Sequence, residues 1–268
     1  MMRHRLFMSL RSLSSLSAAL LCALCVAGCA HGPAAGFAPS RGFIPEAELP
    51  DAVAFLPPPP ADGSAAKAWD LARHELAKKQ REDPARAALA ARDAVFTWEN
   101  LYASFSPAYG RTMSEAETPA LCALLHFALD TTRQSYRRAK RTYRRPRPFA
   151  ELGEPPLRPE DVRLGADSYP SGHAATAWAA ALVLCEVRPA NAEGLLARAF
   201  EAGESRLVCG VHWASDVEAG RLVAGAAVAR MHADPDFRGL LEAALREEVA
   251  LPQAPGPSAK PVDNEMAL

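Results

Sequence analysis

The sequence predicts an all-α protein that folds as a single-domain helical bundle. The chain has 268 residues, 49% of them hydrophobic, which is enough for one domain of about 200 residues with a sizeable core. Apolar residues recur at helical spacing, as at Leu121, Leu124, Leu125 and Ala128. No stretch shows strand-like alternation or an Asn-Gly hairpin turn. The bundle follows from this periodicity and from the absence of strand signals.

Helix starts are predicted in the first half of the domain at three points. Ser64 can cap one helix, while Asp83 and Thr118 each stand directly before a proline that suits the first turn of a helix. The third helix is expected to carry Lys140 near its end. Prolines on both sides of Arg147 prevent a further helical turn, so we expect Arg147 on an extended segment.

The second half of the domain is also predicted to be helical. Four helices are expected, at 174–185, 190–206, 212–231 and 234–247. The first of these is too short to cross a bilayer and is expected to be a buried core helix. Gly210 breaks the chain between the second and the third. Residues 149–167 contain prolines and little periodicity, as a surface loop does.

Composition divides the chain into four regions. These are a leader at 1–28, a tether and extended arm rich in Pro, Gly and Ala at 29–63, the helical domain at 64–250, and a polar tail expected to be disordered at 251–268. The leader has a basic start and then an uncharged apolar run that ends at Gly28, as a secretory signal does. We therefore expect an exported protein.

Small residues stand directly before Cys29, and this pattern resembles the lipoprotein box of bacteria. The resemblance implies cleavage before Cys29 and acylation of its thiol. Ala30 follows, which implies the outer membrane of a Gram-negative bacterium, with the protein facing the periplasm. The membrane would be contacted only through this lipid anchor. An ordinary cleaved signal and an uncleaved anchor are the alternatives.

Charge and cysteine content further limit the possible partners and disulfides. The chain carries 30 Lys and Arg against 31 Asp and Glu, a balance that argues against nucleic acid as a partner. Beyond the leader and Cys29, three cysteines remain: Cys122, Cys185 and Cys209. An odd number permits one disulfide and one thiol, and the sequence does not assign the pairing. It also leaves open whether the chain forms a homo-oligomer.

Residues 203–216, GESRLVCGVHWASD, hold the most informative spacing. His212 and Asp216 are four residues apart and would share one face of a helix, so the carboxylate can hold one imidazole nitrogen and leave the other as a nucleophile. Ser205 and Arg206 precede them, and the guanidinium adds a permanent charge. Taken alone, such a pair is more typical of a solvated helix face.

Two further stretches contain residues that favour a bound anion. Residues 170–173 read Pro-Ser-Gly-His at a helix start, where backbone amides favour an anion. Lys140 and Arg147-Pro148 are separated by six intervening residues in a basic stretch. Each alone is also typical of a turn or of a solvated basic patch. In this order, K-x6-RP, PSGH and SR-x5-H-x3-D resemble the phosphatidic acid phosphatase type 2 superfamily, and the flanks over 50–247 resemble its bacterial class A non-specific acid phosphatases.

The resemblance implies a helical fold of the phosphatase and haloperoxidase type, and it implies a role for each matching residue. The expected phosphate ligands are Lys140, Arg147, Ser171, Gly172 and Arg206. His212 would attack phosphorus and form a phosphohistidine, His173 would serve as general acid and base, and Asp216 would align His212. The expected substrates are small phosphate esters, with phosphate and vanadate as inhibitors. No cofactor is expected, and no metal, because three fixed cations would repel one.

Other functions remain compatible with the same motifs. Vanadate-dependent haloperoxidases use the same cradle, in longer chains. Lipid phosphatases of this superfamily usually span the membrane several times, which this sequence does not predict. A metal site built from His173 and His212 is disfavoured by the surrounding cations. A catalytically silent surface lipoprotein would be expected to have lost a motif residue, and none is missing here.

Overall fold

Helices account for all the regular secondary structure of the part that the computed structural model describes, residues 37–252, which contains no strand. The predicted all-α fold is therefore confirmed. The predicted leader, Cys29 and the tail beyond residue 252 lie outside the described residues. Among the described residues, no helix combines the length and the apolar character needed to cross a bilayer.

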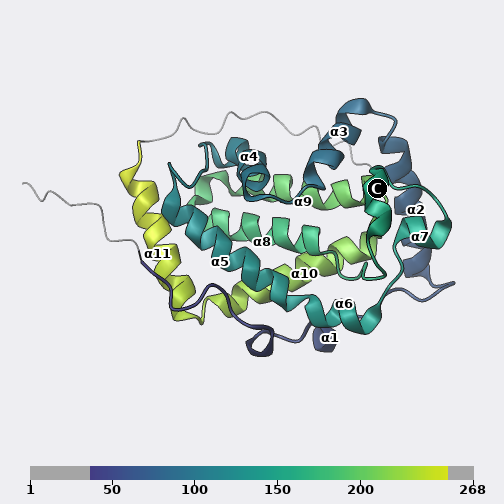
Figure 1. The fold of residues 1–268 in the computed structure, drawn as a ribbon, viewed down its shortest axis with the longest axis horizontal. Coiled ribbons are helices and arrows are strands. Elements are labelled where there is room, and N and C mark those ends of the chain that lie inside the picture. Colours follow the sequence, from purple (N-terminus) through teal and green to yellow (C-terminus); the bar gives the residue numbers. More distant parts are fainter. Residues whose placement is uncertain (1–36, 253–268) are drawn as a thin grey trace, which may run out of the picture. The chain divides into compact units, whose positions relative to one another are not determined.

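Three helices form the centre of the bundle: α8 (Gly172–Val187), α9 (Ala192–Val208) and α10 (Ala214–Met231). They lie side by side, and short connections that include η3 (Pro189–Asn191) reverse the chain between them (Figure 1). Because helices that follow one another in the chain run in opposite directions, the start of α8, the end of α9 and the start of α10 meet at one end. The topology alone thus brings the PSGH stretch next to residues 205–216.

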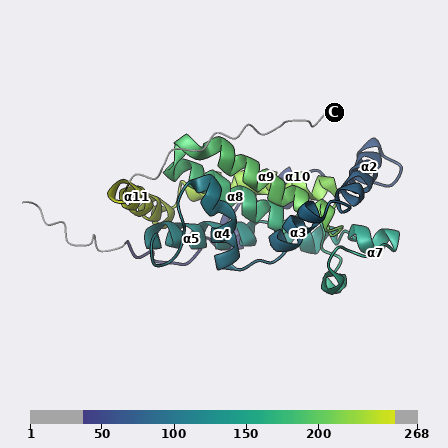
Figure 2. The same ribbon diagram turned by 90° about the horizontal axis from the view of Figure 1, so that it is seen from above.

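The remaining helices cover this centre. Helix α5 (Pro119–Ser135) packs on α8 and α10, and α11 (Pro235–Ala250) packs across α5 at one end of the bundle (Figure 2). Three helices pack on α9: α2 (Ala65–Gln80), α3 (Pro84–Asp93) and α4 (Trp98–Tyr109). Aromatic contacts such as Phe127 with Phe237, 6.3 Å between ring centroids, join α5 to α11.

Side-chain caps explain where these helices begin. The hydroxyl of Ser64 accepts a hydrogen bond from the Lys67 amide (3.1 Å), and Asp83 caps α3 in the same way. The predicted starts of α2, α3 and α5 are confirmed. Helix α4 was not predicted, although Thr97 caps it by accepting from the Asn100 amide at 3.1 Å.

The prediction that Lys140 lies near the end of the third helix is wrong. Helix α5 ends at Ser135, and Lys140 belongs to a separate short helix, α6 (Arg137–Tyr143). The hydroxyls of Thr132 and Ser135 donate to backbone carbonyls of their own helix, at 2.8 and 2.6 Å. Such back-bonding bends helices, which accounts for the break.

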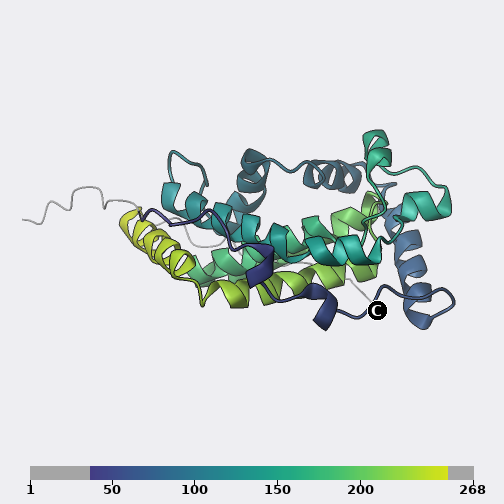
Figure 3. The same cartoon turned by 60° about the horizontal axis from the view of Figure 1, so that its bottom comes forward.

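Part of the predicted tether and arm packs on the bundle. Ile44 is fully buried, and its amide donates to Thr131 Oγ1 on α5 at 3.0 Å. Two short helices follow, η1 (Glu46–Glu48) and α1 (Ala52–Phe55), and α1 packs against α6 (Figure 3).

The predicted loop at 149–167 also contains two short helices, α7 (Pro148–Leu152) and η2 (Pro159–Arg163). Cys122, Cys185 and Cys209 are all free thiols.

Candidate active site

A cavity of about 460 Å³ lies at the end of the bundle where α8 and α10 begin and α9 ends. Six of the predicted site residues line it: Lys140, Arg147, Gly172, His173, Arg206 and His212. These side chains come from α6, from the extended segment that follows it, and from three ends of the central helices. The fold therefore gathers most of the motif residues around one space.

Three polar motif residues lie outside the lining of this cavity. Ser171 is fully buried and caps α8 by accepting from the Ala174 amide at 3.4 Å. Asp216 is fully buried behind His212. Ser205, the first residue of the third motif, donates its hydroxyl proton to Asp93 at 2.6 Å. Its hydroxyl is thus engaged with α3.

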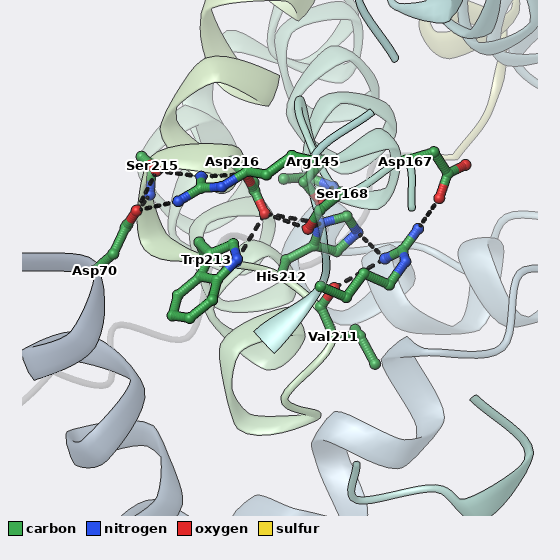
Figure 4. Close-up of polar contacts among 12 residues, drawn as sticks. Asp70, Arg145, Asp167, Ser168, Val211, His212, Trp213, Ser215 and Asp216 are labelled. Atoms are coloured by element: carbon green, nitrogen blue, oxygen red, sulfur yellow. Dashed lines mark hydrogen bonds and ion pairs between the residues drawn. The ribbon is translucent and has the colours of Figure 1, made fainter. Parts of the chain in front are cut away.

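The hydrogen bonds of His212 fix which ring nitrogen carries the hydrogen. Nε2 lies 3.1 Å from Nη1 of Arg147, and a guanidinium can only donate, so Nε2 is the unprotonated nitrogen. Nδ1 then carries the hydrogen and faces two acceptors, Ser168 Oγ at 3.3 Å and Asp216 Oδ2 at 3.4 Å (Figure 4). The nitrogen with the lone pair is therefore the one beside Arg147.

The contact between His212 and Asp216 forms for a reason other than the predicted one. His212 precedes α10, whose N-cap is Trp213, so the two residues do not share a helical face. Asp216 sits in the first turn and folds back over the helix start, where its Oδ2 also accepts from the Trp213 amide at 2.8 Å. The carboxylate thus accepts hydrogen bonds both from the helix start and from the histidine.

Behind Asp216 lies a buried charge network that sequence reasoning missed (Figure 4). Arg145 donates to Asp216 Oδ1 and to Asp70 Oδ2, both at 2.6 Å. Ser215 donates to Asp70 through its amide (2.8 Å) and its hydroxyl (2.7 Å). Both carboxylates are fully buried and Arg145 is 5% exposed. Because an unpaired buried charge costs several kcal/mol, these groups hold one another and Asp216 in place.

Two cations of the cavity are anchored by one residue, Asp167, which the sequence did not single out. Arg147 Nη2 donates to Asp167 Oδ1 at 2.6 Å, and Lys140 donates to the Asp167 backbone carbonyl. Burial lowers the pKa of Lys140 to about 8, although the Asp167 carboxylate opposes that shift. The lysine therefore stays charged in neutral and acidic solution.

Arg206 is the most enclosed cation of the cavity. Its side chain is 2% exposed, its Nη1 donates to Cys209 Sγ at 3.9 Å, and its Nε has no hydrogen-bond partner among the described residues. Burial lowers the pKa of this guanidinium from its usual value. A buried guanidinium with a free donor is suited to bind an anion.

The two imidazoles of the cavity are both held in the neutral form. Burial and the positive charge of Arg206 lower the pKa of His173 well below 6.5. Burial and the positive charges of Arg147 and Lys140 do the same to the pKa of His212. His173 donates from Nε2 to the Ala94 carbonyl at 3.3 Å. Its Nδ1 has no hydrogen-bond partner in residues 37–252.

Gly172 has a packing role that the sequence did not indicate. A Cβ at this position would lie 2.9 Å from the ring of Tyr136, closer than real contacts allow. Gly210 also has a conformational role, since its φ of 72° is left-handed and forms the predicted break before His212. The cavity therefore depends on both glycines.

One group of possible metal ligands occurs in residues 37–252, away from the cavity lining. It consists of His74, Glu75 and Glu154. Lys78 already contacts both carboxylates, at 3.3 and 2.7 Å. The ammonium group thus occupies the position that a cation would take.

Comparison with known proteins agrees with this arrangement. Residues 119–239 match the family model described as the PAP2 superfamily. A non-specific acid phosphatase of Providencia stuartii is 39% identical over 212 residues, which cover 78% of this chain and 85% of that protein. An acid phosphatase of Zymomonas mobilis is 37% identical over 199 residues, covering 74% and 75%. A non-specific acid phosphatase of Salmonella typhimurium is 38% identical over 200 residues, covering 73% and 78%.

The residues that match the family model, 119–239, include all three motifs whose residues meet at the cavity. The chain therefore belongs to the PAP2 superfamily and, within it, to the bacterial non-specific acid phosphatases, which are phosphoric monoester hydrolases.

Proposed function

We propose that the chain hydrolyses a broad range of phosphomonoesters without a metal, through a phosphohistidine formed on His212. The observation that carries this proposal is the state of that ring. Its Nδ1–H faces Asp216 and Ser168, and its unprotonated Nε2 lies beside Arg147 in a cavity that Lys140 and Arg206 also line. A nucleophile held in one tautomer next to fixed positive charge is what attack on a phosphate ester requires.

In the first step, the lone pair of His212 Nε2 forms a bond to phosphorus while the bond from phosphorus to the ester oxygen breaks. His173, in the protonated form that it adopts in acidic solution, gives its extra proton to the departing oxygen. Lys140, Arg147 and Arg206 balance the negative charge of the phosphoryl oxygens. Asp216 stabilises the positive charge that develops on the His212 ring.

In the second step, water attacks the phosphohistidine. His173, now neutral, takes a proton from the water, and the bond between phosphorus and Nε2 breaks. The electron pair returns to His212 and inorganic phosphate leaves. The Gly172 amide at the start of α8, together with the Ser171 hydroxyl, is proposed to hold the phosphoryl oxygens in both steps.

The first test is release of p-nitrophenol from its phosphate with EDTA present. We expect activity that EDTA does not abolish and that phosphate and vanadate inhibit. Loss of activity in EDTA, restored by a divalent metal, would contradict the metal-free mechanism. Bromide oxidation with vanadate and peroxide, without phosphatase activity, would favour a haloperoxidase. Broad specificity predicts comparable kcat/KM for chemically unrelated monoesters.

We also propose that the protein is exported and anchored to the outer membrane through a lipid on Cys29. The support is the leader pattern of residues 1–28 and the small residues before the cysteine. Labelled palmitate should be incorporated into the wild-type protein and not into Cys29→Ala. Wild-type protein recovered in the soluble periplasmic fraction without label would reject the anchor.

A further inference from the structure

A second, more open groove of about 610 Å³ adjoins the active-site cavity. It is lined by Arg137, Lys140, Arg141, Arg144, Ala166 and Asp167. Three of these residues, Arg137, Lys140 and Asp167, also line the cavity. A ligand whose phosphate lies beside His212 can therefore extend along α6 without leaving the surface.

The groove has an excess of positive charge. Its one carboxylate, that of Asp167, already accepts from Arg147 at 2.6 Å. Arg141 contacts Glu46 at 2.5 Å in a solvent-exposed pair, an interaction that contributes little. Arg137 and Arg144 form no ion pair with any carboxylate of residues 37–252. These guanidinium groups remain available to an anion.

Arg144 adopts an unusual backbone conformation. It ends α6 with φ 44° and ψ 41°, and it is the one non-glycine residue at positive φ among the described residues. Glycine or asparagine is the usual residue at such a helix end, because a side chain there strains the backbone. The side chain of Arg144 is exposed at this helix end and lines the groove.

We propose that Arg137, Arg141 and Arg144, here called the groove arginines, form a subsite for a second phosphate group that the leaving group carries. The preferred substrates are then soluble organic bisphosphates, with one phosphate at His212 and the other on α6. Guanidinium groups suit this role, because their planar forks bind phosphate with two hydrogen bonds. The inference rests on the proposed phosphatase activity of the same site.

The test compares kcat/KM for fructose 1,6-bisphosphate and fructose 6-phosphate. The double variant Arg141→Gln/Arg144→Gly removes two charges that line only the groove, and glycine relieves the left-handed backbone. We expect the wild type to favour the bisphosphate by about tenfold, and the double variant to lose most of that preference. Arg138→Gln is the matched control, because Arg138 lies on α6, pairs with Asp51 at 2.8 Å and does not line the groove.

The outcomes separate this inference from the proposed function. Wild-type protein inactive on p-nitrophenyl phosphate would overturn the proposed function itself. An active enzyme with no preference for the bisphosphate, or a double variant that loses activity equally on both sugars, would overturn the subsite alone. Inhibition by a single-stranded oligonucleotide that the double variant abolishes, without bisphosphate preference, would assign the groove to nucleic acid instead. Unchanged thermal unfolding of the variants confirms that they are folded.

Discussion

Arg144 and Arg145 are neighbours in sequence but have different surroundings near the active site. Arg145 is 5% exposed and lies between the fully buried carboxylates of Asp70 and Asp216. Arg144 is exposed and has no carboxylate partner in the described part of the chain. A buried charge is tolerated only when it is paired, whereas an exposed one needs no partner.

The difference separates two kinds of function around one cavity. The buried wall behind His212, formed by Asp70, Arg145 and Asp216, contains fixed charges that pair with one another. It can therefore orient the ring but cannot bind a ligand. The α6 side contains exposed arginines that the protein engages only in part, so it can bind a ligand. Each of the following experiments tests whether this division is real.

The largest expected effect is a fall in kcat when the buried wall is altered at Asp216. Asp216→Asn keeps the shape of the side chain but removes the charge that faces Nδ1 of His212 and stabilises the ring once Nε2 is bonded to phosphorus. We expect kcat to fall about 10²- to 10⁴-fold with KM little changed. Steady-state kinetics on p-nitrophenyl phosphate would measure this, with Arg138→Gln as a control. A fall of less than about threefold would remove Asp216 from the mechanism.

The next comparison concerns stability and uses the two neighbouring arginines. Arg145→Met leaves two buried carboxylates without their partner and should lower the free energy of unfolding by about 3–5 kcal/mol. Arg144→Met removes an exposed, unpaired charge and should change it by no more than about 0.5 kcal/mol. Urea denaturation of both variants provides the measurement. Equal destabilisation would mean that the two sides of the cavity do not differ as described.

The pH dependence of activity tests the protonation of the two imidazoles. Burial and the neighbouring cations lower the pKa of both histidines well below 6.5, so His173 is protonated and able to act as an acid only in acidic solution. Above pH 8 the pKa of Lys140, about 8, adds a loss of phosphate binding. The kcat/KM profile should therefore have its maximum below about pH 6.5 and decline as the pH rises. A maximum above about pH 8 would contradict this assignment.

The smallest expected effect lies at Asp167, where the two sides meet. Its carboxylate neutralises Arg147 and competes with the phosphate of a substrate. Asp167→Asn should lower KM, and the inhibition constant for phosphate, by about threefold to fivefold. Phosphate inhibition of p-nitrophenol release measures this directly. A raised inhibition constant would show that Asp167 positions Arg147 more than it competes with substrate.

Sequence patterns predicted the residues of the cavity better than their local structure. The helix starts at Ser64, Asp83 and Thr118 were predictable because a side-chain cap, as at Ser64 and Asp83, and a proline in the first turn, as after Asp83 and Thr118, are local signals. The break after Ser135 was not, because it depends on hydroxyls that bond to their own helix. His212 and Asp216 were paired correctly, but the pairing comes from a carboxylate that folds back over the start of α10.

The buried wall could not be predicted from the sequence. Asp70 lies on α2 and reaches Arg145 only after α2 has packed against the central helices. Nothing near it in sequence distinguishes it from an ordinary surface carboxylate. Arg145 stands two residues before Arg147 within the basic stretch, which offered a weak signal. Long-range pairing of buried charges therefore requires the fold.

The measurement that tests the account most directly is trapping of the covalent intermediate. The protein would be mixed with ³²P-labelled p-nitrophenyl phosphate and quenched in alkaline denaturant, in which phosphohistidine survives. We predict label on the peptide that contains His212, none in His212→Ala, and accumulation of label in His173→Asn, because that variant lacks the base for hydrolysis. Label that persists in His212→Ala at the wild-type level would contradict the central assignment.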